Sequence, residues 1–189
     1  MQLWVGLGNP GAEYAMNRHN AGFQAVDAIA ALHGFAAPRK AFQGWTQEGR
    51  IGTEKVVLLK PATFMNESGR AVRAAADFFK LGAEAITVFH DELDLAPLKV
   101  KVKTGGGTAG QNGLRSIVQH LDPAFRRVRI GIGHPGHKDR VTGHVLSNWH
   151  KSEVEALSEL LGAIAAEAPL LAAGDDVRFM NDVALRVAA

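Results

Sequence analysis

Polar residues suited to acid–base chemistry recur just after apolar stretches of the chain. These residues are Asn9, His19, Asn66, Asp91 and Asn112. A histidine and a carboxylate can share general base work, while amides orient a substrate or donate to developing negative charge. The sequence has no cysteine, which excludes disulfides and thiol nucleophiles, and it has neither a G-x-S-x-G nor an H-E-x-x-H motif. The eight histidines lack metal-ligand spacing. What remains is general base chemistry by a histidine and a carboxylate, with amides that orient a substrate and stabilise charge.

Alternating strand and helix patterns must position these residues. Apolar runs predict strands over 3–7, 43–50, 55–60, 86–90, 98–103 and 127–132, and helical periodicity predicts helices over 21–32, 67–81 and 112–121. Two further helices are expected at the C-terminal end, the first after a capping box formed by Ser152 and Glu155 and the second from about residue 176. Asn112 is expected to cap the third helix. This pattern predicts one α/β domain of three layers over residues 1–189, with a mostly parallel sheet.

In such a sheet, ligands bind beyond the carboxyl ends of the strands. The polar segments after the predicted strands, including the glycine loop 105–110, are therefore expected to meet on one rim. A single Asn beside a turn is more often a turn residue or a helix cap, but several at equivalent positions favour a site.

Basic residues are concentrated in one part of the chain. Residues 99–151 contain ten Lys or Arg and only two acidic residues, although the net charge of the whole chain is +2. Within this part, residues 98–103 alternate apolar side chains with lysine, so three lysines share one face of a strand. This concentration indicates a polyanion site, and the alternative is an ordinary solvated face.

The first glycine loop, VGLGNPG at residues 5–11, fits the dinucleotide-binding pattern G-x-G-x-x-G. That site needs its third glycine in the first turn of a helix. Here Asn9-Pro10 favours a turn, a polar stretch delays the helix until about Asn20, and Asp27 lies in a helix rather than at a strand end. We therefore interpret the loop as a sharp turn that presents Asn9.

Six ordered motifs resemble the bacterial peptidyl-tRNA hydrolase family. They are VGLGNPG (5–11), Y-A-x-N-R-H-N-A-G (14–22), LLKPATFMNESG (58–69), HDELDL (90–95), GGG-x-x-G-Q-N-G-L-R (105–115) and RIGIGHPG (129–136). The resemblance implies a monomeric α/β fold with a mixed sheet, no metal, no cofactor and no obligate protein partner. It implies hydrolysis of the ester between a peptide and the terminal ribose of tRNA, which recycles tRNA from aborted translation.

Residue roles follow from the same motifs. His19 corresponds to the family's general base, Asp91 to its orienting partner, and Asn9 to the amide that distinguishes N-blocked from free aminoacyl-tRNA. The residues that correspond to the lining of the peptide and tRNA-end site are Tyr14, Phe64, Met65, Asn66 and Asn112. Lys103 and Arg129 match residues associated with tRNA phosphate.

The sequence departs from the family pattern in two places. Gln111 stands where the family commonly has His, in a loop made bulkier by Thr108 and Ala109, and Ala96-Pro97-Leu98 replaces Pro-Pro-Gly. Glutamine cannot change charge, so we do not expect Gln111 to carry a proton.

Two other functions remain as alternatives. They are a non-catalytic RNA-binding protein on the same scaffold and a nicotinamide-dependent oxidoreductase. The N-terminus lacks a basic segment before an apolar run, and no stretch approaches the roughly 20 apolar residues of a membrane span, so we expect a cytoplasmic protein.

Overall fold

A computed structural model describes residues 1–188 of the chain. Its strands are β1 (Gln2–Gly6), β2 (Arg39–Ala41), β3 (Gly44–Ile51), β4 (Glu54–Pro61), β5 (Ile86–Glu92), β6 (Val100–Thr104) and β7 (Arg126–Gly131). They form one sheet in the order β2-β3-β4-β1-β5-β7-β6. The four central strands, β4, β1, β5 and β7, are parallel, and antiparallel pairs close both edges. The sheet is therefore mixed, with its parallel part at the centre.

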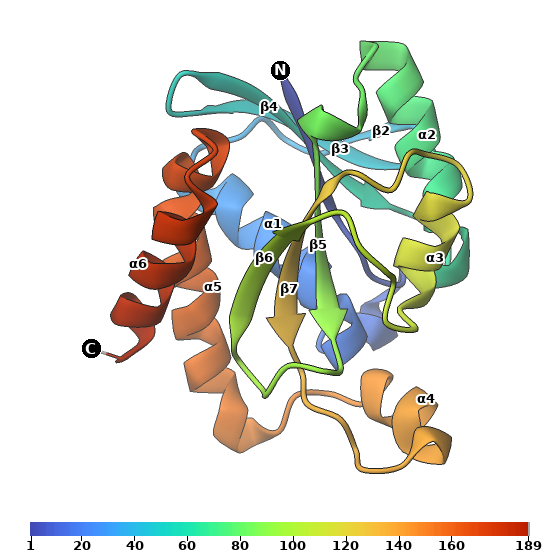
Figure 1. The fold of residues 1–189 in the computed structure, drawn as a ribbon, viewed down its shortest axis with the longest axis vertical. Helices are drawn as coiled ribbons and strands as arrows, with labels where there is room; N and C mark the ends of the chain where they lie inside the picture. Colours follow the sequence, from blue (N-terminus) through green and yellow to red (C-terminus); the bar gives the residue numbers. More distant parts are fainter. Residues whose placement is uncertain (189) are drawn as a thin grey trace.

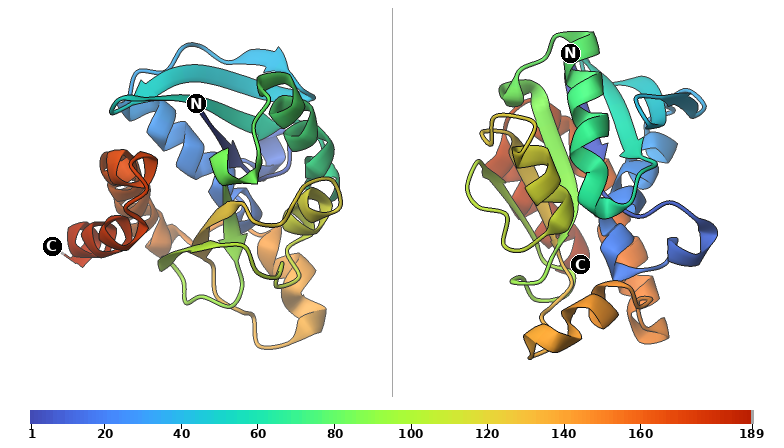
Figure 2. Two further views of the ribbon diagram at one scale, coloured as in Figure 1. Left: turned by 45° about the horizontal axis from the view of Figure 1, so that its top comes forward. Right: turned by 90° about the vertical axis from the view of Figure 1, so that its right-hand side faces the viewer.

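Helices cover both faces of the sheet, as predicted for three layers. The helices of the fold are α1 (Ala21–Leu32), α2 (Ser68–Phe79), α3 (Asn112–Val118), α4 (Val141–Val145), α5 (Lys151–Ala172) and α6 (Asp176–Ala188). Helices α1, α5 and α6 lie on one side of the sheet and α2 and α3 on the other (Figure 1, Figure 2). The arrowheads of β5 and β7 point toward α4, which lies beyond the carboxyl edge of the sheet (Figure 1). Within residues 1–188, no helix is both long and apolar enough to cross a membrane.

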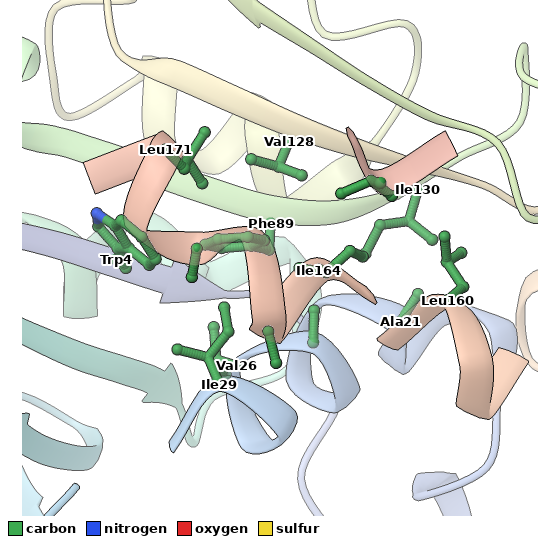
Figure 3. Packing of buried hydrophobic residues seen from close by; sticks show 14 of the residues in the cluster. Trp4, Ala21, Val26, Ile29, Phe89, Val128, Ile130, Leu160, Ile164 and Leu171 are labelled. Carbon is green, nitrogen blue, oxygen red and sulfur yellow. The ribbon is translucent and has the colours of Figure 1, made fainter. Parts of the chain in front are cut away.

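Two hydrophobic clusters hold the layers together, one on each face of the sheet. Trp4, Phe89 and Val128 point from the strands toward Val26 of α1 and Ile164 of α5 (Figure 3). On the other face, strand residues pack against the apolar sides of α2 and α3. Burial of apolar surface contributes roughly 25 cal/mol per Å2, so these clusters provide the main driving force for the fold. The rim beyond the strands is left to polar residues.

Most predicted elements are confirmed to within two or three residues, but both predicted helix caps are wrong. Helix α3 is capped by Gln111, whose side chain accepts a hydrogen bond from the Leu114 N–H, and Asn112 is its first residue. The capping box of helix α5 lies two residues earlier than predicted: it is formed by His150 and Glu153, and the His150 N–H donates to the Glu153 side chain. Both errors arise because each segment contains two polar residues suited to capping within two positions of one another. Strand β2 and helix α4 were not predicted.

The first glycine loop does not enter a helix, as we expected. Helix α1 begins only at Ala21, after short 3-10 turns at Ala12–Tyr14 and Arg18–Asn20. Gly22 brings this helix very close to the sheet, because a Cβ atom there would collide with the Phe89 carbonyl oxygen and the backbone of Leu7. The close approach sets the turn that contains His19 against the end of β5.

The second glycine loop reaches the carboxyl edge by an unexpected route. Strand β6 runs antiparallel to β7, so it ends at the opposite, amino edge of the sheet. The loop then doubles back toward α3, with left-handed backbone at Gly105, Gly106 and Gly110. The buried guanidinium of Arg127 donates to the carbonyl oxygens of Gly106 and Gly107 and holds the loop on the sheet. The segment therefore does not follow a parallel strand, although its end reaches the rim as expected.

Candidate active site

A cavity of about 320 Å3 lies beyond the carboxyl ends of β1 and β5. Eight residues predicted from the sequence line it: Asn9, Tyr14, His19, Phe64, Met65, Asn66, Asp91 and Asn112. They come from four segments that are far apart in the chain and that the parallel strands bring together. Hence the structure places these eight predicted residues at one cavity.

His19 and Asp91 form a buried pair in this cavity. The distance between His19 Nδ1 and Asp91 Oδ2 is 2.7 Å, and the two residues are only 7% and 3% exposed. Asp91 lies near the end of β5, and His19 lies in the 3-10 turn before α1. Because the carboxylate engages Nδ1, the imidazole keeps its proton there and presents the lone pair of Nε2 as a base.

Gln111 holds the other oxygen of the same carboxylate. Its Nε2 donates to Asp91 Oδ1 at 2.9 Å, and its Oε1 accepts the Leu114 N–H at 2.8 Å. Both carboxylate oxygens of Asp91 are therefore engaged, and the carboxylate is linked to the first turn of α3. Sequence reasoning treated Gln111 only as a departure from the family pattern and missed this contact.

Two opposing effects set the protonation of His19. Burial disfavours the charged imidazolium and lowers its pKa, while the negative charge and hydrogen bond of Asp91 favour it more strongly. The net result is a pKa of His19 above the ordinary histidine value. By contrast, burial lowers the pKa of the adjacent His90 to about 4, and its Nδ1 donates to the Asp91 carbonyl oxygen. His90 is thus a neutral packed residue, and His19 is the histidine suited to proton transfer.

The side chain of Asn9 is fixed in one orientation. Its Oδ1 accepts the Met65 N–H at 2.7 Å, so its Nδ2 is the group left to donate. The Asn20 side chain binds the Asn9 backbone twice, accepting from its N–H at 2.8 Å and donating to its carbonyl oxygen at 3.0 Å. Asn9 is 7% exposed. The loop therefore presents a preoriented amide donor at the cavity.

The remaining predicted lining residues differ in depth. Met65 is buried at 3% exposure, while Phe64 is 57% exposed at the mouth of the cavity. Asn66 and Asn112 are exposed, and Tyr14 is partly buried. The cavity thus has an apolar floor and an aromatic and amide rim, which suits a ligand with both apolar and polar parts.

One wall of the cavity was not predicted. It consists of Val141, Thr142, Val145 and Leu146, from α4 and the residue after it. Arg18, next to His19, fixes the position of this segment by two contacts. Its Nη1 donates a hydrogen bond to Ser147 Oγ at 2.5 Å, and its Nη2 lies 3.5 Å from Glu153 Oε1. Arg18 is 4% exposed. A helix of five residues that contains Gly143 has too little periodicity to be recognised in the sequence.

Lys103 and Arg129 lie outside this cavity. They line a smaller neighbouring cavity of about 160 Å3, together with His90 and Arg127. Glu92 and Ala109 line both cavities, so the two adjoin. In the β6–β7 ladder Lys103 pairs with Arg127 and Lys101 with Arg129, which puts four cations on one face of the two strands. The predicted basic residues therefore form a separate surface beside the chemical site.

Within residues 1–188, no group of three or more His, Asp or Glu is arranged to hold a metal ion. The groups that the cavity provides are an oriented imidazole base, a fixed amide donor and exposed amides. This set can activate water and stabilise negative charge on a carbonyl oxygen.

The chain matches the family model described as peptidyl-tRNA hydrolase over residues 3–188. Peptidyl-tRNA hydrolase of Sphingopyxis alaskensis is 71% identical over 187 residues, which cover 99% of each chain. That of Novosphingobium aromaticivorans is 72% identical over 186 residues, covering 98% of this chain and 97% of the relative. The crystal structure of peptidyl-tRNA hydrolase from Acinetobacter baumannii superimposes with a TM-score of 0.91 at 44% identity, covering 97% of this chain and 94% of that one. The similarity in sequence and fold thus extends over nearly the whole chain.

Proposed function

The chain belongs to the peptidyl-tRNA hydrolase family and hydrolyses peptidyl-tRNA, and from this premise we propose that His19 is the general base and Asp91 its orienting partner. The observation that carries these roles is the buried hydrogen bond of 2.7 Å between His19 Nδ1 and Asp91 Oδ2 in the lined cavity. A protein that only binds RNA has no use for such an oriented base.

In the proposed reaction, His19 Nε2 removes a proton from a water molecule that attacks the ester carbonyl carbon. Asp91 stabilises the imidazolium that forms. The tetrahedral intermediate then collapses, the bond from the carbonyl carbon to the ribose oxygen breaks, and that oxygen takes the proton from His19. The products are a peptide with a free carboxyl group and tRNA with a free terminal hydroxyl, and the imidazole is neutral again.

Amide groups supply the polar recognition in this proposal. The fixed Nδ2 of Asn9 donates to a carbonyl of the N-blocked substrate, which is how it distinguishes that substrate from free aminoacyl-tRNA. Asn66 and Asn112 donate from the rim to the ester and the terminal nucleotide. A donor that meets developing negative charge typically contributes about 3–4 kcal/mol to catalysis.

Apolar contacts hold the groups on either side of the ester. Phe64 is the exposed ring suited to stacking with the terminal base, since aromatic side chains bind unpaired bases in this way. Met65 and Tyr14 contact the esterified amino-acid residue.

The cationic face of β6 and β7 binds phosphates of the acceptor arm in this proposal. Lys103 and Arg129 lie beside the cavity rather than in it, so they position the tRNA without acting on the ester. Charge contacts with the backbone carry no sequence information, which suits an enzyme that accepts many tRNAs.

We further propose that residues 1–189 act as one domain, monomeric and without an obligate protein partner. Two clusters that share one sheet support a single folding unit. Because its substrate is a tRNA ester, we place the enzyme in the cytoplasm in this proposal.

The test of the base assignment is His19→Ala, with His33→Ala as its matched control. His33 follows the last residue of α1, at the opposite end of the helix from His19. With N-acetyl-aminoacyl-tRNA, we expect His19→Ala to lose turnover by at least about 100-fold and to keep its binding affinity, while the control retains both. Near-normal turnover by a folded His19→Ala variant would refute the assignment.

A further inference from the structure

We propose that a groove beside the reaction cavity binds the peptide of the substrate, on the N-terminal side of the esterified residue. We call it the Trp45 groove, and its lining includes Pro10, Phe23, Gln24, Trp45, Lys60 and Ala62. This inference rests on the proposed function, because it places the ester at His19.

The groove consists of two hollows, of which the first adjoins the reaction cavity and the second adjoins the first. The first, of about 260 Å3, shares Asn9 with the cavity. The second, of about 460 Å3, shares Trp45 and Ala62 with the first. Ala62 lines the groove and Phe64 lines the cavity, so only the wall formed by Asn9 and its hydrogen bond to the Met65 N–H separates the two, and in this proposal the peptide crosses over that wall. A peptide that leaves the ester in this direction would meet Trp45.

The order of the strands gives the substrate a direction. Across the sheet in strand order, the cationic face lies on β7 and β6 beside the reaction cavity, the His19–Asp91 pair lies at the carboxyl end of β5, and the Trp45 groove lies at the carboxyl end of β4 and the start of β3. The ester joins an anionic nucleic acid to a peptide. With the nucleic acid on the β6 side, the peptide extends toward β4 and β3.

The walls of the groove suit apolar peptide side chains. Trp45 is 40% exposed, so its ring offers apolar surface to the groove. Phe23, Pro10 and Pro61 add further apolar surface. A peptide side chain that covers the Trp45 ring removes apolar area from water.

Two side chains in the groove have buried oxygen atoms without a hydrogen-bond partner among the described residues. They are Oε1 of Gln24 in the first hollow and Oγ1 of Thr63 in the second. Gln24 is fixed by the bond from its Nε2 to the Ala15 carbonyl oxygen at 3.0 Å. Both oxygen atoms are buried, so a main-chain N–H of a peptide satisfies them only once the side chain turns toward the groove.

The charges of the groove favour a peptide over nucleic acid. The Lys60 ammonium lies 2.7 Å from Asp27 Oδ1, so the acid largely neutralises it. Lys40 is the other cation, and it lies over the Trp45 ring at 5.4 Å. A phosphate chain would gain more from Lys101, Lys103 and Arg129 on β6 and β7, where Arg127 is buried beneath the glycine loop.

The experiment compares a short and a long substrate. The short one carries a single N-acetylated residue, and the long one carries an apolar hexapeptide, which spans roughly 20 Å when extended. Trp45→Ala is the test variant, Trp45→Phe restores a ring, and Phe78→Ala removes an aromatic side chain that is 68% exposed on α2, outside the groove. Circular dichroism and thermal unfolding check that each variant folds.

We expect Trp45→Ala to raise KM for the hexapeptide substrate about tenfold, with a change under about twofold for the short one. Trp45→Phe recovers most of the difference, and Phe78→Ala behaves as the wild type. Equal losses on both substrates would overturn the proposal, because they would assign Trp45 to tRNA binding or to the fold. No loss on either substrate would also overturn it. Failure of the wild type to hydrolyse either substrate would instead overturn the proposed function.

Discussion

The protonation state of His19 sets the pH range in which the enzyme can work. The base must be neutral to accept a proton from water, so activity should rise as pH increases through the pKa of His19. Asp91 raises that pKa above the ordinary value, although burial opposes it. A raised pKa also means that the pair stabilises the fold at pH values below the ordinary pKa of histidine, and that this contribution is lost as pH rises through the raised value.

Asp91→Asn should therefore change the pH profile as well as the rate. Without the carboxylate, burial is the remaining influence, and the acid limb of the log kcat/KM profile should move to lower pH. At neutral pH kcat should fall by about 10²–10⁴-fold, because the imidazole loses its orienting acceptor. The measurement is kcat/KM between about pH 5 and 8 on N-acetyl-aminoacyl-tRNA. An acid limb that stays in place, or moves to higher pH, would contradict the assigned coupling.

At the level of elements, Gln111 links helix α3 to the catalytic pair. One end of its amide caps the helix and the other binds Asp91, so the orientation of the carboxylate depends on the first turn of α3. A glutamine performs both tasks without a charge, so this support does not change with pH.

Gln111→Ala should lower both stability and rate. Loss of the cap should reduce the free energy of unfolding by about 0.5–2 kcal/mol. Loss of the hydrogen bond to Asp91 Oδ1 should lower kcat about tenfold, because a hydrogen bond to a charged group contributes about 1.5 kcal/mol. Denaturant unfolding and steady-state kinetics give the two quantities. Gln111→His, which restores a ring donor, should recover most of kcat; a Gln111→Ala variant with wild-type kcat would show that Asp91 needs no such support.

The limits of sequence prediction also lie at the level of elements. The central strands and α1 follow from periodicity, and so does the rim that gathers Asn9, His19 and Asp91. The direction of β6 cannot be predicted from periodicity, because the alternation of apolar and charged residues is the same in a parallel and in an antiparallel strand. The bond between Gln111 and Asp91 depends on the path of a glycine loop that local sequence leaves open, since glycine populates left-handed and right-handed backbone about equally.

For the whole molecule, cations lie beside the reaction cavity and not within it. Lys103→Glu should weaken tRNA binding and reduce the slope of log affinity against log salt by about one, because a phosphate contact and its released counterion are lost. Hydrolysis of a minimal ester without the tRNA body should change little. Lys55→Glu, on β4, is the matched control. A similar loss on the minimal ester would place Lys103 in the chemistry.

The buried carboxylate of Asp91 has a consequence for the end of the catalytic cycle. Hydrolysis turns an uncharged ester into a peptide carboxylate, and this new anion arises in a cavity where Asp91 is 3% exposed and poorly screened by water. When the proton has left His19, two negative charges face one another in a low-dielectric site. Electrostatic repulsion then expels the peptide, so the enzyme should suffer little product inhibition by peptide acids, whereas uncharged peptide amides of the same sequence should bind more tightly.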